Sequence, residues 1–176
     1  GGSGVSVGVN GSTLGVNYQL YRGTTLVGGP VSGTGAALDF GLQTTAGTYT
    51  VIGTNTMTSC SSNMASSASV VINALPTAYT VTGGGNYCPG GIGVNVGIGG
   101  SGLGISYQLY NGTATVGSPV SGSGSSINFG LQTAPGTYTV VATNNATGCT
   151  NSMVGSVGVT TNPLPALFAV SSSSSN

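Results

Sequence analysis

An internal repeat constrains this chain more than any other feature of its sequence. Aligned with itself at an offset of 89 residues, the sequence matches without a gap. The motif Tyr-Gln-Leu-Tyr at 18–21 falls on the same motif at 107–110, and Phe-Gly-Leu-Gln-Thr at 40–44 falls on 129–133. Repetition at a fixed period is typical of tandem arrays in which each repeat is one structural unit. We therefore expect copies of one 89-residue module.

The stretch Gly136–Asn144 alternates strictly between two kinds of side chain, and it has a near copy at Gly47–Asn55. Tyr138, Val140 and Ala142 fall on one face, whereas threonines and one valine fall on the other. Period-2 alternation is the pattern of a strand that is covered on one side. We expect this stretch to be a buried central strand, against which the rest of the module pairs or packs.

Further short alternating stretches, separated by turn residues, predict about seven strands in each module. Asn111 and Gly112 form a strong hairpin motif between two of them, because both residues tolerate a positive φ. No segment shows the 3.6-residue period of a helix. The expected fold is an all-β, antiparallel β-sandwich. In the second module the expected strands are 79–82, 93–98, 105–110, 115–120, 126–129, 136–144 and 154–161.

The register of the repeat also predicts the domain organisation. Residues 1–76 form a first module that lacks its opening strand, and residues 77–165 form a complete second module. Residues 166–176 begin a following module or a linker. Both ends of the chain therefore look cut from a longer array.

Proline-containing segments are expected to join the modules. Asn-Ala-Leu-Pro at 73–76 and Asn-Pro-Leu-Pro at 162–165 predict short, stiff joints, because proline fixes φ and resists strand pairing. The serine run at 171–175 has the glycine-rich segment 82–86 as its counterpart. We interpret the serine run as a flexible or weakly specified linker.

Charge is almost absent from this chain. The sequence holds one Arg or Lys, one Asp or Glu and no His in 176 residues, against roughly 25% charged residues in an average soluble domain. A surface with so few charges has a weak electrostatic field and therefore does not attract nucleic acid. No apolar run approaches the ~18 residues of a membrane helix. We therefore expect neither nucleic-acid binding nor membrane insertion.

The ionisable residues offer no repeated catalytic or metal site. Arg22 and Asp39 are replaced by Asn111 and Asn128 in the second module, so a site needed in every repeat cannot use them. Without His there is no Ser-His-Asp arrangement. Calcium requires several carboxylates, and zinc requires His or clustered Cys. We expect no catalysis, no cofactor and no metal.

Three cysteines, Cys60, Cys88 and Cys149, favour an oxidising, extracellular location in a chain of this composition. One hypothesis is a Cys88–Cys149 disulfide inside the second module, with Cys60 bonded to a partner outside the chain. In the usual sandwich order, however, those two positions lie at opposite ends, too far apart for a bridge. The alternative hypothesis pairs each cysteine with one from a neighbouring module or chain.

Both modules contain a strand that reads Gly-Thr-Tyr-Thr-Val after a tight turn. It resembles the tyrosine-corner strand of immunoglobulin-like domains, in which the tyrosine lies two residues before a core position. Tyr49 and Tyr138 match that tyrosine, and Val51 and Val140 match the position where antibody domains carry a core cysteine. The valines exclude an antibody-type domain. The resemblance implies an immunoglobulin-like (Ig-like) fold for both modules.

The sequence also combines five short motifs: Cys-x-Gly-Gly, Tyr-Gln-Leu-Tyr, Gly-Thr-Tyr-Thr-Val, Thr-Gly-Cys and Asn-Pro-Leu-Pro. This combination is similar to the tandem Ig-like repeats of very large bacterial surface proteins, the adhesins and gliding-associated proteins of the Bacteroidetes type. The resemblance covers both modules. It implies an exported protein that serves as a stalk, adhesin or fibre at the cell surface.

Two functions remain open from the sequence. The first is a structural repeat of an extracellular filament or adhesin stalk, whose partners are neighbouring repeats or other copies of the chain. Open edge strands permit assembly by strand exchange, and the first module could take a strand from a neighbour. The second is a binding module for surface carbohydrate, in which exposed Tyr21 and Tyr110 stack on sugar rings.

Overall fold

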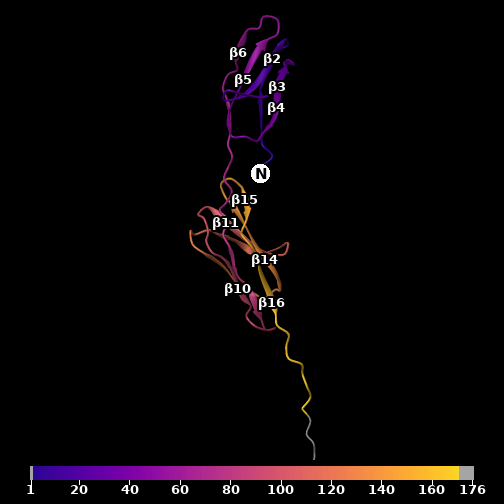
Figure 1. The fold of residues 1–176 in the computed structure, drawn as a ribbon, viewed down its shortest axis with the longest axis vertical. Helices are drawn as coiled ribbons and strands as arrows, with labels where there is room; N and C mark the ends of the chain where they lie inside the picture. The colour runs from indigo at the N-terminus through magenta and orange to yellow at the C-terminus, as the bar shows by residue number, and fades with distance from the viewer. Residues whose placement is uncertain (1, 171–176) are drawn as a thin grey trace, which may run out of the picture. The chain divides into compact units, whose positions relative to one another are not determined.

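The computed structural model describes residues 2–170 of the chain. Every regular element in this range is a β-strand, and the sheets are antiparallel apart from one parallel pair. The chain divides into two compact units, unit 1 at Gly1–Ile72 and unit 2 at Asn73–Asn176 (Figure 1). The expected all-β protein with several antiparallel sheets is confirmed, and its sheets are consistent with a β-sandwich. The serine run at 171–175 lies outside the described residues.

Unit 1 contains two antiparallel sheets. One pairs β1 with β4, and the other has the strand order β3-β2-β5-β6, with β7 also paired to β5. The strands are β1 (Val5–Val9), β2 (Val16–Arg22), β3 (Thr25–Ser32), β4 (Leu38–Gln43), β5 (Gly47–Asn55), β6 (Ser61–Asn63) and β7 (Ala68–Val70).

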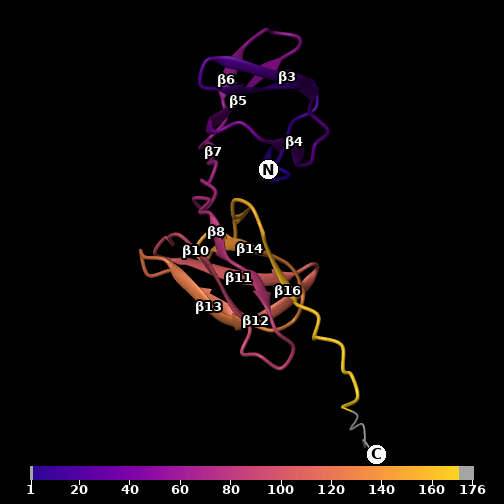
Figure 2. The same cartoon turned by 60° about the horizontal axis from the view of Figure 1, so that its bottom comes forward.

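Unit 2 also contains two sheets, and each has strands that unit 1 does not show. One sheet has the order β13-β10-β8, and the other β12-β11-β14-β16-β9, with β15 also paired to β14 (Figure 2). The strand β9 runs parallel to β16. The strands are β8 (Val81–Gly83), β9 (Gly85–Tyr87), β10 (Val94–Ile98), β11 (Ile105–Asn111), β12 (Ala114–Ser121), β13 (Ile127–Gln132), β14 (Gly136–Asn144), β15 (Thr150–Ser152) and β16 (Val157–Thr161).

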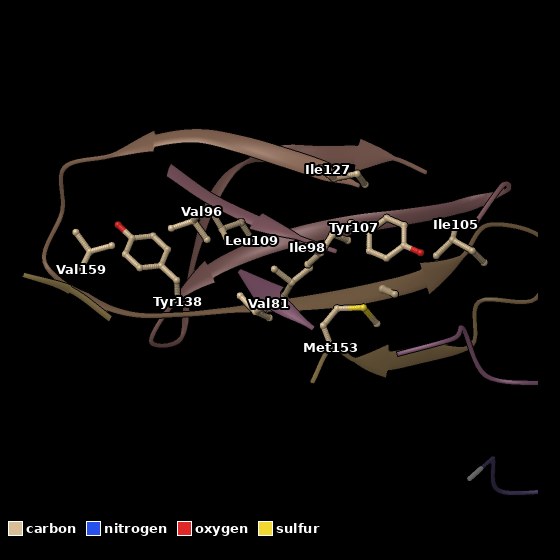
Figure 3. Packing of buried hydrophobic residues seen from close by; sticks show 12 residues of the cluster. Val81, Val96, Ile98, Ile105, Tyr107, Leu109, Ile127, Tyr138, Met153 and Val159 are labelled. Atoms are coloured by element: carbon tan, nitrogen blue, oxygen red, sulfur yellow. The ribbon is translucent and has the colours of Figure 1, made fainter. Parts of the chain in front are cut away.

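The buried central strand expected from the alternating pattern is β14. It lies between β11 and β16 in its sheet, and Tyr138, Val140 and Ala142 are each exposed by 1% or less. These side chains belong to a core cluster in which Figure 3 shows the ring of Tyr138. In unit 1, Tyr49 and Val51 of β5 are buried in the same way. The prediction of the buried face is therefore confirmed.

The motif Tyr-Gln-Leu-Tyr folds around a β-bulge between β11 and β12. Tyr107 and Leu109 point into the core and are almost fully buried, whereas the register of pairing shifts between them. The amide of Gln108 donates hydrogen bonds to the carbonyls of Leu109 (2.8 Å) and Val116 (3.0 Å) at that shift. A bulge leaves backbone groups without ladder partners, and this glutamine satisfies them. The motif thus encodes two core residues and the amide that closes the bulge.

The expected hairpin is present, but its turn differs in detail from the prediction. Asn111 pairs with Ala114 as the last residue of β11, so the turn residues are Gly112 and Thr113. Only Gly112 has a positive φ (60°), which fits a type II′ turn rather than type I′. Because position 111 is in the strand, Asn is not needed there. This explains why the first copy tolerates Arg22.

Unit 2 differs from the sequence expectation at both of its ends. No strand was expected between residues 82 and 93, but Gly85–Tyr87 forms the strand β9. The last strand begins at Val157 rather than at 154, and the short strand β15 precedes it. Parallel pairing with β16 stabilises β9, and a partner 74 residues away leaves no local pattern. Local alternation could not predict this strand.

We expect Leu109→Ala to destabilise unit 2 by about 2 to 5 kcal/mol, because it leaves a cavity in the centre of the core. Leu103→Ala is the matched control, since Leu103 is 78% exposed and its loss should change the stability by less than about 0.5 kcal/mol. Urea unfolding followed by tyrosine fluorescence measures both. Equal effects of the two substitutions would contradict the described core.

Candidate functional site

The same tyrosine contact occurs at the start of the central strand in both units. The hydroxyl of Tyr138 donates to the carbonyl of Ala134 (2.7 Å), and the hydroxyl of Tyr49 donates to the carbonyl of Thr45 (2.8 Å). Each ring is buried while its hydroxyl reaches back four residues along the chain. The contact fixes the turn that enters the strand. Tyr49, Tyr138 and the valines two residues further on are therefore structural.

The glycine two residues before this tyrosine leaves space for a side chain from the neighbouring strand. A Cβ at Gly136 would lie 1.9 Å from the amide oxygen of Asn111, and a Cβ at Gly47 would lie 2.8 Å from the Cγ of Arg22. Both glycines have φ near 150°, in a region that favours glycine. The lone arginine thus packs its stem against the backbone.

Asp39, the lone acid, closes a turn. Its carboxylate accepts hydrogen bonds from the hydroxyl of Ser6 (2.7 Å) and the backbone N–H of Gly41 (2.8 Å). The bond from Ser6, followed by that from Gly41, lowers the pKa of Asp39. In unit 2, Asn128 accepts the equivalent bond from Gly130 (2.8 Å). Since an amide oxygen accepts the same hydrogen bond, this position requires a hydrogen-bond acceptor rather than a negative charge.

The candidate sugar-stacking residues, Tyr21 and Tyr110, lie on the sheet face opposite the core, at the ends of β2 and β11. Both are half-buried rather than exposed as expected. Tyr110 pairs with Thr115 on one side and Thr139 on the other. Neither tyrosine lines the two hollows of unit 1 described below. Carbohydrate stacking on these residues stays a prediction.

The structure places Cys88 and Cys149 at opposite ends of unit 2. Cys149 accepts a hydrogen bond from Asn144 at the end of β14, whereas Cys88 follows Tyr87, which pairs with Thr161 beyond the start of β14. At about 3.3 Å per residue, the length of β14 separates them by roughly 25 Å. Bridged Cα atoms lie only ~6 Å apart. The proposed Cys88–Cys149 disulfide is therefore wrong for this structure.

All three cysteines are free, and Cys60 and Cys88 are exposed. Cys60 lies in unit 1 where Cys149 lies in unit 2, since each carbonyl accepts the N–H of the asparagine that ends the central strand. Pairing with a cysteine of another module or chain stays a prediction.

An open groove lies beside the core of unit 1. Residues 7–11 of β1 and its end form one wall, residues 64–68 form the other, and residues 49–51 of β5 form the floor. The groove has a volume of about 110 Å³ and continues into a hollow of about 520 Å³ at Asn10 and Gly11. We call it the unit 1 groove. The groove runs along β1, and a strand edge of this kind suits an extended peptide.

The sequence pattern did not predict the residues that line the unit 1 groove. Within residues 2–170, β1 pairs with β4 on one edge, whereas its counterpart β10 pairs with both β13 and β8. Met64, Ala65 and Ser66 were not predicted to line a groove, because they form a loop without an alternating pattern. Their matches Met153 and Val154, which contact the opening strand in unit 2, could have revealed them.

No family model and no curated protein sequence matches this chain. Within residues 2–170, no three His, Cys, Asp or Glu side chains come together as metal ligands. Over the same range no helix is long and apolar enough to cross a membrane.

We expect Tyr138→Phe to destabilise unit 2 by about 0.5 to 1.5 kcal/mol at neutral pH, because the carbonyl of Ala134 loses its hydroxyl donor. Tyr110→Phe is the matched control, since Tyr110 lies on the outer face. Urea unfolding at pH 7 measures the difference. Equal loss in both variants would contradict the assigned hydroxyl contact.

The same variants test a pH effect. Burial raises the pKa of Tyr138 above its ordinary value, so the unfolded chain releases this proton first, near pH 10. The stabilisation by the neutral phenol is fully present below that pH and is lost as the pH rises through the higher pKa of the folded state. We expect stability to fall less between pH 8 and pH 11 in Tyr138→Phe than in Tyr110→Phe. A larger fall in Tyr138→Phe would contradict the raised pKa.

Proposed function

We propose that this chain is a segment of structural repeats from an extracellular filament or a cell-surface adhesin stalk, without catalytic activity of its own. One observation carries the proposal. The tyrosine-bearing core strand is built twice, 89 positions apart, with the same buried face and the same hydroxyl contact. Selection for a repeated scaffold accounts for that duplication, because each copy preserves packing residues rather than a reactive group.

Strand pairing supports the assignment of the units as two copies of one module. β1 and β4 pair Val5 with Gln43, and β10 and β13 pair Val94 with Gln132, 89 positions further along. The register shift near the middle of each pair also recurs at matched residues. The tyrosine contact is the one that Ig-like domains make at their tyrosine corner. We therefore propose an Ig-like module related to the repeats of Bacteroidetes-type surface proteins.

The ionisable residues support a scaffold rather than an enzyme. Arg22 packs its stem on Gly47, and Asp39 accepts hydrogen bonds within a turn. Both positions hold asparagine in the other module. Acid–base catalysis needs a positioned titratable group, and the repeated positions supply none.

An antibody raised against the purified chain tests the proposal on the cells that produce it. We expect it to label projecting filaments or stalks on unpermeabilised cells, and we expect elastase treatment of intact cells to remove the label. Elastase suits this chain better than trypsin, because Arg22 is its one tryptic site. Labelling that requires permeabilised cells would contradict an extracellular role.

A further inference from the structure

In unit 2, the segment that begins with Tyr79 fills the place that corresponds to the unit 1 groove. The carbonyl of Thr80 accepts a hydrogen bond from Gly99 (3.0 Å), next to β10. On the other side, Val81 donates to the carbonyl of Val154 (2.9 Å), and Val154 donates to the carbonyl of Tyr79 (2.8 Å). The segment is thus bound as a strand on both of its edges. It lies antiparallel to β10 and parallel to the residues around Val154.

This strand completes the core of unit 2. Val81 pairs with Ile98 and belongs to one cluster with Ile98 and Met153, where Figure 3 shows all three side chains. Ile98 is 1% exposed and Met153 is 6% exposed. Their counterparts in unit 1, Val9 and Met64, are only half-buried and line the groove. The difference follows from the strand that covers them in unit 2.

The ring of Tyr79 also has a matching space in unit 1. It packs on Gly100, where an added Cβ would lie 2.6 Å from the ring. Gly11 is the counterpart of Gly100 at the 89-residue offset, and an added Cβ there would have no atom within 4 Å. The unit 1 groove therefore has room for an aromatic ring above Gly11.

The chain itself carries a second segment of the required pattern. At the same offset, residues 166–170 match residues 77–81, so that Phe168 falls on Tyr79 and Val170 falls on Val81. Leu167, Phe168 and Val170 are 88% exposed or more in the structure. Exposed apolar residues in a row are typical of a binding surface.

We propose that residues 166–170 of one copy bind as a β-strand in the unit 1 groove of a second copy. Val170 then lies opposite Val9, and the ring of Phe168 covers Gly11. By analogy with unit 2, Asn10 donates to the carbonyl of Ala169, Val170 donates to the carbonyl of Ala65, and Ala65 donates to the carbonyl of Phe168. Among residues 2–170, these groups of Asn10 and Ala65 make no backbone hydrogen bond.

Such a contact is head-to-tail, because the groove and the strand are different surfaces of one chain. Contacts of this kind that do not close into a ring generate open filaments. The inference rests on the proposed filament role, since it names the contact that joins one copy to the next. Its strand-binding step can nevertheless be tested apart from that role.

The first test is self-association of the 176-residue chain, measured by sedimentation velocity with a reducing agent to exclude disulfides. We expect oligomers that grow with concentration. Val170→Asp should abolish them, because it places a carboxylate against the apolar side chain of Val9. Ala169→Asp is the matched control: its counterpart Thr80 is exposed, so association should persist. Both residues lie in an exposed tail, so neither substitution affects folding of the units.

The second test identifies the groove. A fluorescent peptide of residues 163–175 should bind the Val170→Asp chain, whose groove is intact. Adding Gly11→Val should weaken peptide binding at least about tenfold, or ~1.4 kcal/mol, because the new side chain occupies the ring space. Gly29→Val is the control, since Gly29 also has open space and lies on β3. Both glycines have φ outside the left-handed region, so valine is tolerated.

A chain that stays monomeric at all concentrations, or oligomers that survive Val170→Asp, would overturn the proposal. Peptide binding that is insensitive to Gly11→Val would also overturn it. Monomers whose tail occupies their own groove would reject the second copy as the occupant. These failures leave the surface labelling unchanged, because a stalk can also be built from covalently linked modules. Failure of the labelling, in turn, would not alter the peptide result.

Discussion

The pairing of each strand edge with a neighbouring backbone is the constraint on which this structure depends. A chain almost without charge has little besides backbone hydrogen bonds and apolar burial to hold it together. In unit 2, β10 is paired on both edges, by β13 and by β8. In unit 1, β1 is paired by β4 on one edge. The consequences of that difference reach the core, where Val9 and Met64 remain half-buried.

The central strand shows how a polar residue is used when charge is scarce. The large ring of Tyr138 is buried in the core, and its hydroxyl donates a hydrogen bond to the carbonyl of Ala134. Gln108 likewise closes a bulge, and Asn144 accepts two backbone N–H groups in the loop that follows β14. Each amide or hydroxyl satisfies backbone groups that a turn or bulge leaves open. The repeated motifs therefore supply the side chains that form hydrogen bonds with otherwise unpaired backbone groups.

Several features were predictable because they are local. Alternation in 136–144 identified the buried face of β14, and the proline in the segment 115–120 predicted an edge strand, which β12 is. The position of the hairpin was predictable, but its turn type was not, because Gly112 alone takes the positive φ. The strand β9 was missed, since it depends on parallel pairing with a strand far along the chain. The half-buried state of Tyr110 was missed for a similar reason, because strands on both sides flank it.

By itself, the sequence determined the all-β class, the buried face of the central strand and the match between the two halves of the sequence, because each follows from residue order and period. Only the tertiary structure decided which groups meet across long separations. It placed Cys88 and Cys149 at opposite ends of unit 2, and it placed Met64 beside β1 as a wall of the unit 1 groove. Strand pairing joins residues that are distant in the chain, and no local pattern records which partner an edge accepts.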